Sequence, residues 1–222
     1  MDPFTYSSLA RRRQPPLDRL ALAIAAEFRD VDVERSLEAL DRLGAEVLGE
    51  RGGTPGAELE LCRRTLVERH GFVGDRGRYH EPAGSMLDLV LERGRGLPIL
   101  LSVVWVEVGR RAGIPLAGIG LAGIGLPGHF VVGHFGAAPP LLVDPFAGGR
   151  QLEAAVEPAL VRPWGPHETA LRMLNNLVAS YSGRGDIGAA IRAAGLRLEL
   201  PLDERAQAAF GLELRSLESS LN

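Results

Sequence analysis

Apolar residues recur at helical spacing along the first third of the chain. From Leu17 onward they form three groups whose members lie mostly three or four positions apart: Leu17, Leu20, Ile24 and Phe28; Leu37, Leu40, Leu43 and Leu48; and Leu59, Cys62 and Leu66. Side chains at this spacing share one face of an α-helix, so the pattern predicts three amphipathic helices. Glycine and proline residues at 52–56 separate the second helix from the third.

Two further helices are predicted before the pattern changes. The run SMLD at 85–88 has the form of a capping box, so we expect a fourth helix to begin at Ser85 and to end in the glycine-rich link 94–96. Pro98 suits the first turn of a fifth helix, because proline there loses no hydrogen bond that the helix needs. This helix should run to about Ala112, where Gly113 ends it.

Beyond residue 115 the pattern becomes typical of β-strands and then helical again. The segments 116–126, 129–135 and 141–144 predict a small antiparallel sheet whose last two strands form a hairpin. From Pro166 the spacing predicts two antiparallel helices joined by a tight turn, similar to a tetratricopeptide unit. One last helix should follow, to about Leu217.

The glycine-rich stretch before His129 contains the pattern GxGxxG twice, at 118–123 and 123–128. A dinucleotide site needs these glycines between a strand and a helix, whereas here a helix precedes them and β-type residues follow. We therefore interpret the stretch as a strand and turn that lead to His129. The repeat of LAGIG at 116–120 and 121–125 indicates a short duplication, which a bulge or a longer loop would absorb.

Composition excludes several classes of function. The formal charge is only −3, with acidic and basic residues interspersed, so we expect no nucleic-acid partner and no membrane-binding face. All 25 basic residues are arginine, which excludes a catalytic or phosphate-binding lysine. The single cysteine excludes an internal disulfide and a zinc site of paired thiolates.

The sequence also indicates what to expect of cofactors and of cellular location. The histidines show no metal-ligand spacing, so neither a metal nor a cofactor is expected. No apolar run reaches the length of a signal peptide or the ~20 residues of a membrane span, so we expect a soluble, cytoplasmic protein.

Candidate catalytic chemistry centres on His129 and Asp144. His129 begins one predicted strand, Asp144 ends the next, and a helix start at 97–99 precedes both. That order matches papain-like and transglutaminase-like cysteine enzymes, in which a helix dipole lowers the pKa of the thiol, histidine takes its proton and the acid orients the imidazole. The residues at the helix start, Leu97, Pro98 and Ile99, offer no nucleophile.

Two other side chains are candidates to replace the missing nucleophile. Cys62 shares an apolar helical face with Leu59 and Leu66, so we expect a buried, inert thiol. Ser102 lies one turn into the fifth helix, where a nucleophile activated by His129 and a small side chain packed beneath the sheet are both open, with packing favoured.

The dyad of His129 and Asp144 has a structural alternative, in which the two side chains only tie the hairpin together. If Gly136 pairs with Pro139, Asp144 lies on the same face as His129; a slip of one residue moves it to the other face. The remaining histidines are weaker candidates: His70, His80, His134 and His167.

Several of these segments together resemble the SirB family of bacterial proteins, whose central region is related to the transglutaminase core. The resemblance is carried by GRGLPILLSVVWVEVGRRAGIPLAGIG at 94–120, LPGHFVVG at 126–133 and VDPFAGGRQL at 143–152, and extends to 71–91 and 172–201. It implies an α+β fold: a helical N-terminal part, a core of one central helix and a small antiparallel sheet, and a helical tail similar to tetratricopeptide repeats.

The resemblance also implies a function. His129 and Asp144 match the histidine and aspartate of the transglutaminase triad, and the cysteine position falls at about Pro98. This implies a non-catalytic binding or regulatory protein that takes a protein partner or a small ligand in the remnant cleft. The alternative is an atypical hydrolase or acyl- or amide-transfer enzyme that uses the dyad. Leu100 and Gly84 stand where the family usually has a small hydroxyl residue and an asparagine, which weakens the catalytic alternative.

We therefore expect four parts within one compact unit. Residues 1–16, which include three consecutive arginines and a pair of prolines, should form a flexible leader. Residues 17–84 form the N-terminal helical part, 85–160 the transglutaminase-like core, and 161–222 the tetratricopeptide-like tail.

Overall fold

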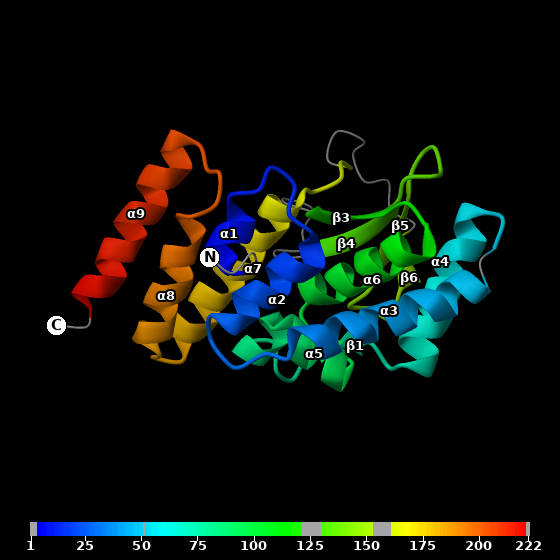
Figure 1. Ribbon diagram of the computed structural model, residues 1–222, viewed down its shortest axis with the longest axis horizontal. Coiled ribbons are helices and arrows are strands. Elements are labelled where there is room, and N and C mark those ends of the chain that lie inside the picture. Colours follow the sequence, from blue (N-terminus) through cyan, green and yellow to red (C-terminus); the bar gives the residue numbers. More distant parts are fainter. Residues whose placement is uncertain (1–3, 51, 121–129, 153–160, 221–222) are drawn as a thin grey trace.

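The computed structural model describes residues 4–50, 52–120, 130–152 and 161–220, and its elements surround one central helix (Figure 1). In chain order they are α1 (Tyr6–Ala10), α2 (Leu17–Ala26), α3 (Val33–Gly49), α4 (Pro55–Arg63), η1 (Arg64–Arg69), β1 (Val73–Gly74), η2 (Pro82–Ser85), α5 (Leu87–Arg93), β2 (Arg95–Gly96), α6 (Pro98–Ala112), β3 (Leu116–Gly120), β4 (Phe130–His134), β5 (Leu141–Asp144), β6 (Arg150–Gln151), α7 (Pro166–Gly183), α8 (Ile187–Arg197) and α9 (Glu204–Ser219). The fold is α+β, as the sequence predicts.

Helix α6 is the element on which the rest is assembled. It contacts α2, α3, α5 and α7 as well as strands β3 and β4. Its predicted bounds are confirmed: Pro98 opens the first turn, and Gly113 ends it in the left-handed conformation at φ 70°. Most of its side chains are buried, so α6 has neighbours on nearly every face.

The three predicted N-terminal helices are confirmed as α2, α3 and α4. Side chains that accept a hydrogen bond from the first turn begin two of them: Asp32 accepts from Arg35 N at 3.0 Å in α3, and Thr54 accepts from Ala57 N at 3.3 Å in α4. Helix α4 continues into the π-helical turn η1, which the apolar spacing did not indicate.

The predicted capping box at Ser85 is wrong, although a helix follows it. Ser85 ends η2, and α5 begins only after Met86, which is extended at φ −107° and ψ 115°. Met86 therefore occupies the cap position, and Ser85 precedes it by one residue. Within the described residues, the buried Ser85 Oγ has no hydrogen-bond partner.

The N-terminal segment differs from the flexible leader expected over 1–16. Residues 6–10 form helix α1, in which Tyr6 and Leu9 are buried. The Tyr6 hydroxyl donates to Leu196 O in α8 at 2.8 Å. The arginines and prolines that suggested a leader follow α1, which packs on α2 and also contacts α8 from the other end of the chain.

The sheet is antiparallel in the order β3-β4-β5-β6. Val132 lies opposite Val143 and Gly133 opposite Leu142, which is the register that places Gly136 across from Pro139. One face of the sheet packs into the main core with α6, and the other carries a smaller apolar cluster around Ile119 and Val131. Predicted strand residues 121–126 and His129 lie outside the described residues.

The C-terminal helices extend from this core to one end of the molecule (Figure 1). Helices α7 and α8 pack together and are joined by a short turn, and Asp186 caps α8 by accepting from Ala189 N at 3.1 Å. Helix α9 packs on α8, and every one of its residues is at least partly exposed. The predicted helical tail is thus confirmed, while its kinship to tetratricopeptide repeats stays a prediction. In the ranges that the structure describes, no helix is long and apolar enough to span a membrane.

Candidate functional site

The start of α6 is where a transglutaminase-like enzyme would carry its nucleophile. The family resemblance implies that this position falls at about Pro98, which is buried between Leu97 and Ile99. Leu97 N donates to Gly84 O at 3.0 Å, which fixes the helix start against η2. The first turn of α6 therefore presents apolar side chains and no thiol or hydroxyl.

Both candidate replacement nucleophiles, Cys62 and Ser102, are buried. Cys62 is buried in α4, and burial, with the negative charge of Glu58, raises the pKa of its thiol to about 12. The predicted burial of this thiol is confirmed, and its inertness stays a prediction. Ser102 is also buried, and its Oγ donates to Phe130 O at 3.4 Å. Ser102 thus packs beneath the start of β4; its relation to His129, which lies outside the described residues, stays a prediction.

Asp144 ends β5 and organises the turn that follows it. Its side chain is buried, and Oδ1 accepts hydrogen bonds from Phe146 N at 2.9 Å and Ala147 N at 3.2 Å. The backbone oxygen of Asp144 accepts from Gly149 N at 2.8 Å. These bonds support a structural role for Asp144, and the observed register is the one that favours a dyad with His129. The dyad itself stays a prediction.

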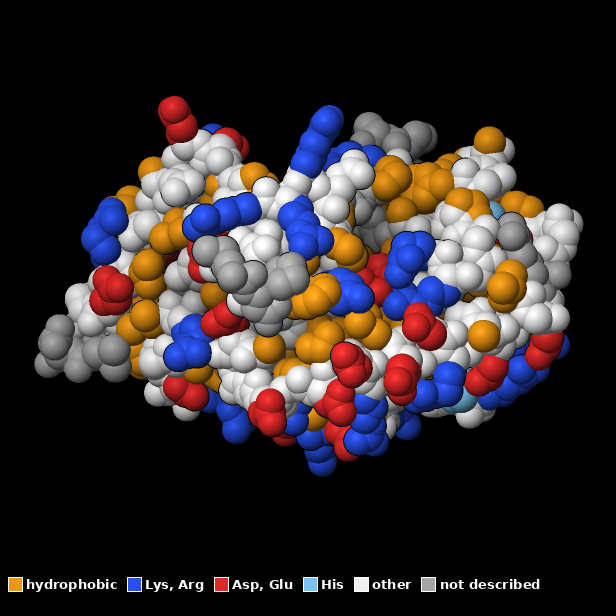
Figure 2. Space-filling model, viewed as in Figure 1, with side chains coloured by type: hydrophobic (Ala, Val, Ile, Leu, Met, Phe, Trp, Pro, Cys, Tyr) orange, Lys and Arg blue, Asp and Glu red, His pale blue; other side chains and the backbone are white. Residues whose placement is uncertain are grey.

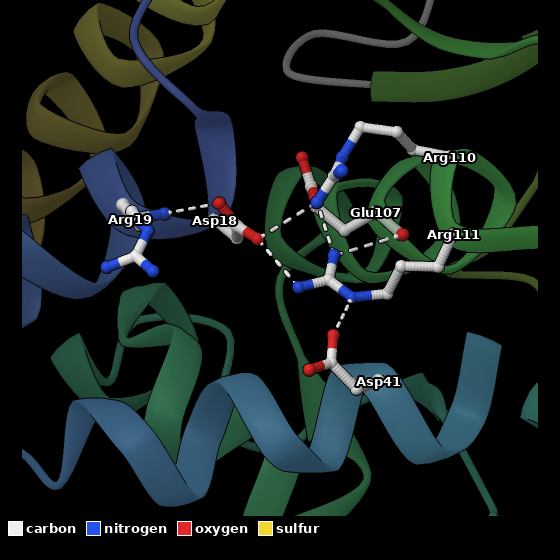
Figure 3. A network of polar contacts seen from close by, with 6 residues as sticks. All are labelled: Asp18, Arg19, Asp41, Glu107, Arg110 and Arg111. Carbon is white, nitrogen blue, oxygen red and sulfur yellow. Dashed lines mark hydrogen bonds and ion pairs between the residues drawn. The ribbon is translucent and has the colours of Figure 1, made fainter. Parts of the chain in front are cut away.

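A network of buried charges lies at the other end of α6 (Figure 3). Arg111 joins two acids: its Nη2 donates to Asp18 Oδ2 and its Nη1 to Glu107 Oε2, both at 2.7 Å. Arg110 donates from Nε to Glu107 Oε2 at 2.9 Å and from Nη2 to Asp18 Oδ2 at 3.2 Å. Arg111 Nε reaches Asp41 Oδ1 at 2.6 Å. The network ties α2, α3 and α6 together.

The two buried acids differ in pKa. Burial raises the pKa of Glu107, and the neighbouring charge of Asp18 raises it further, against the opposing effect of the two arginines. Burial would also raise the pKa of Asp18, but the hydrogen bond and charge of Arg111, with the backbone N–H of Arg19, lower it on balance. Asp18 is therefore the firmly ionised member of the pair.

A cavity of about 790 Å³ borders this network. Its polar wall includes Asp18, Glu107 and Ser102. The apolar wall includes Phe130 and Trp164, whose rings meet edge to face with centroids 5.3 Å apart. In Figure 2 acidic, basic and hydrophobic side chains lie next to one another around the middle of the visible face. The site thus combines an apolar surface with a few converging polar groups, as small-molecule sites do.

Sequence reasoning missed this network, although part of its signal is visible. Glu107, Arg110 and Arg111 stand at i, i+3 and i+4 in a helix that is otherwise almost wholly apolar, so their side chains share one face. A charged trio on a buried helix indicates an internal ion pair. Nothing in the sequence identified Asp18 as its partner.

A second buried pair was also missed. His134 Nδ1 accepts from Gly136 N at 3.1 Å, so Nε2 carries the proton and donates to Glu58 Oε2 at 2.7 Å. The pair joins β4 to α4. The other described histidines lie elsewhere: His70 Nε2 lies 3.0 Å from Glu46 Oε2, and His167 Nε2 lies 3.0 Å from Ala10 O. Among the residues with a described placement, no three His, Cys, Asp or Glu side chains are grouped to hold a metal ion.

Comparison with known proteins shows the family to which this chain belongs. The family model described as "Transglutaminase-like superfamily" matches residues 17–177, which include the central helix, the sheet and most of α7. The chain belongs to the transglutaminase-like superfamily. The predicted relation to a transglutaminase core is confirmed, and the more specific SirB relation stays a prediction.

Its relatives among curated proteins are named UPF0162. A UPF0162 protein of Xylella fastidiosa (strain 9a5c) is 36% identical over 161 residues, which cover 64% of this chain and 56% of that protein. A UPF0162 protein of Pseudomonas aeruginosa is 30% identical over 219 residues, covering 90% of this chain and 78% of that protein. The chain therefore spans little more than half the length of the Xylella relative that it matches. No solved structure matches the chain.

Proposed function

We propose that this transglutaminase-like protein is a non-catalytic binding or regulatory protein that takes its ligand in the cavity along α6. The observation that supports the proposal is the start of α6, where the buried Pro98 stands at about the position that the family resemblance assigns to the nucleophile. The single thiol of the chain is buried, with a pKa raised to about 12. Without a thiolate, the cysteine chemistry of the superfamily has no starting point.

The cavity supports binding in place of that chemistry. Its volume of about 790 Å³ lies in the range of sites for small organic ligands. It extends from Ser102 and Phe130, beside the remnant cleft, to Glu107 and Arg110 near the end of α6. A ligand there would contact the same helix and strand that carry the remnant site.

The first arm of the test measures catalysis. Purified protein is assayed for hydrolysis of p-nitrophenyl acetate and for ammonia release from a glutamine peptide in the presence of a primary amine. We expect rates no higher than those of buffer, and the same for His129→Ala. Turnover that is lost in both His129→Ala and Asp144→Asn would overturn the proposal and establish the hydrolase or acyl-transfer alternative, which the register of β4 and β5 favours.

The second arm measures binding with Nile red, a neutral dye whose fluorescence rises in apolar surroundings. Val106 lines the cavity, so the indole of Val106→Trp should occupy part of it and weaken the dye signal. Leu48→Trp is the matched control, because Leu48 is exposed and does not line the cavity. Unchanged dye binding by a folded Val106→Trp protein would show that the cavity is not the site.

A further inference from the structure

We propose that the cavity selects ligands with a protonated amine or amidine group on an apolar body, and that Glu107 Oε1 accepts the hydrogen bond from this group. The inference rests on the proposed function, because it names the class of ligand that the α6 cavity would bind. Three features support it: the unequal use of the two carboxylate oxygens of Glu107, the charges around this side chain and the apolar wall of the cavity.

The two oxygens of Glu107 have different surroundings. Oε2 accepts from both Arg110 and Arg111. In the part of the chain that the structure describes, no hydrogen bond reaches Oε1, which carries no dashed line in Figure 3. The side chain is only 3% exposed, yet Glu107 lines the cavity. Oε1 is not one of the fully buried, unpartnered atoms of the described residues, so it remains accessible as an acceptor, and the cavity favours a ligand with an N–H group.

The charges around Glu107 favour a positively charged donor on the ligand. Burial and the charge of Asp18 both disfavour the ionised form of Glu107, and a cation within hydrogen-bond distance would stabilise it. The guanidinium of Arg111 already uses four of its five N–H groups, on Asp41, Asp18 and twice on Glu107, so only one N–H of Nη2 is left for a ligand carboxylate. Arg110 is 58% exposed, so solvent screens the part of its charge that faces outward.

The apolar wall provides a place for the rest of the ligand. Phe130 and Trp164 lie edge to face, and Val103, Val106 and Leu116 line the cavity beside them. An aromatic or branched aliphatic body of a few carbon atoms can pack on this wall while its charged end reaches Glu107. The site would therefore distinguish ligands by the charge of the polar end and tolerate variation in the apolar end.

Three probes with one body and different ends test this: 3-phenylpropylamine, 3-phenylpropanol and 3-phenylpropionate. Binding is measured by titration calorimetry and by Trp164 fluorescence, with Trp164→Phe to separate its signal from that of Trp105, the other tryptophan. We expect the amine to bind about tenfold tighter than the alcohol, since a charge-assisted hydrogen bond is about twice as strong as a neutral one. The carboxylate should bind more weakly than the alcohol.

Variants at Glu107 test whether this side chain causes the preference for the amine. Glu107→Gln should lower the affinity for the amine about tenfold and leave the affinity for the alcohol within about twofold, because only the charged pair is lost. Glu107→Asp keeps the charge but shortens its reach, so it should give a smaller loss for the amine and fold even if Glu107→Gln does not. Glu60→Gln is the control, since Glu60 is an exposed acid paired with Arg63 outside the cavity.

The possible failures are distinguishable. Preference for the carboxylate, equal affinity for the amine and the alcohol, or amine binding that survives both Glu107 variants would overturn the ligand class. In those cases the binding function stands if Val106→Trp still weakens binding of the probes. Turnover dependent on His129 would instead overturn the proposed function, whatever the probes show.

Discussion

Removal of Arg111 is the most direct perturbation of the charge network at the end of α6. In Arg111→Met the apolar stem is largely kept, but the guanidinium that bonds to Asp18, Glu107 and Asp41 is lost. The side chains of Asp18 and Glu107 are 4% and 3% exposed, so solvent cannot replace the lost partner. Both acids then remain buried with Arg110 as their common cation.

The size of the effect follows from these burials. Removing one partner of a buried ion pair costs about 3–5 kcal/mol, and we expect about 3 kcal/mol because Arg110 still bonds to both acids. The bond to Asp41 adds little, since that side chain is 66% exposed and such pairs contribute about 0–1 kcal/mol. For a chain of this length the melting temperature should fall by about 6–12 °C.

The loss should depend on pH with a definite sign. Glu107 has its pKa raised above the usual 4.5, so its contribution to stability is complete below pH 4.5 and is lost as the pH rises through its folded pKa. Asp18 has its pKa lowered below 3.8, so it contributes above that value and loses this contribution as the pH falls through its folded pKa. Without Arg111 the pKa of both acids rises. The gap between the two proteins should therefore be small near pH 4 and widen toward pH 8.

Urea unfolding at about pH 4.5 and about pH 8, followed by circular dichroism, measures both quantities. Arg42→Met is the control, because Arg42 pairs with Glu38 at 3.7 Å where both side chains are mostly exposed, and its loss should cost no more than about 0.5 kcal/mol. The reasoning is refuted if Arg111→Met costs less than about 1 kcal/mol at pH 8, or if its cost is the same at both pH values.

Two further predictions concern the thiol of Cys62 and the packing of Trp164 on β3. Burial raises the pKa of the Cys62 thiol to about 12, so native protein should not react with Ellman's reagent at about pH 8. Protein unfolded in guanidinium chloride should release one equivalent of the reagent's thiolate, because the chain has a single cysteine. Fast reaction of the native thiol would contradict its burial. In Gly120→Ala the added methyl group would overlap the Trp164 ring. The free energy of unfolding, measured in urea, should therefore fall by about 1–3 kcal/mol. At Gly183 an added methyl group meets nothing within 4 Å, so Gly183→Ala is the control. Equal urea midpoints of unfolding for the two variants would count against the packing of Trp164 on β3.

Local chemistry made part of the fold predictable from sequence. Pro98 and Gly113 act through their own backbone preferences, and they mark the ends of α6 as expected. The register of β4 and β5, which the sequence left open between two alternatives, is the one in which Val132 lies opposite Val143. The same local reasoning failed at Ser85, because the extended conformation of Met86 depends on how η2 packs, and not on the four residues of the motif.

In the candidate site, too, some features were predictable from local sequence and others were not. Spacing alone identified the apolar residues at the start of α6, the buried thiol of Cys62 and the order of His129 and Asp144. It did not identify the partners of buried charges. Asp18 and Arg111 are 93 positions apart, and Glu58 and His134 are 76 apart.

The sequence by itself therefore determined most of the helices from α2 onward, the hairpin and the lack of a nucleophilic side chain at 97–99, because each depends on residues within a few positions of one another. Only the tertiary structure decided which surfaces meet: α1 on α8 through Tyr6, the ion pairs of Glu107 and the cavity beside them. A polar side chain finds its partner through the packing of whole helices. The residue that completes a buried pair can thus lie anywhere along the chain, and no local pattern marks it.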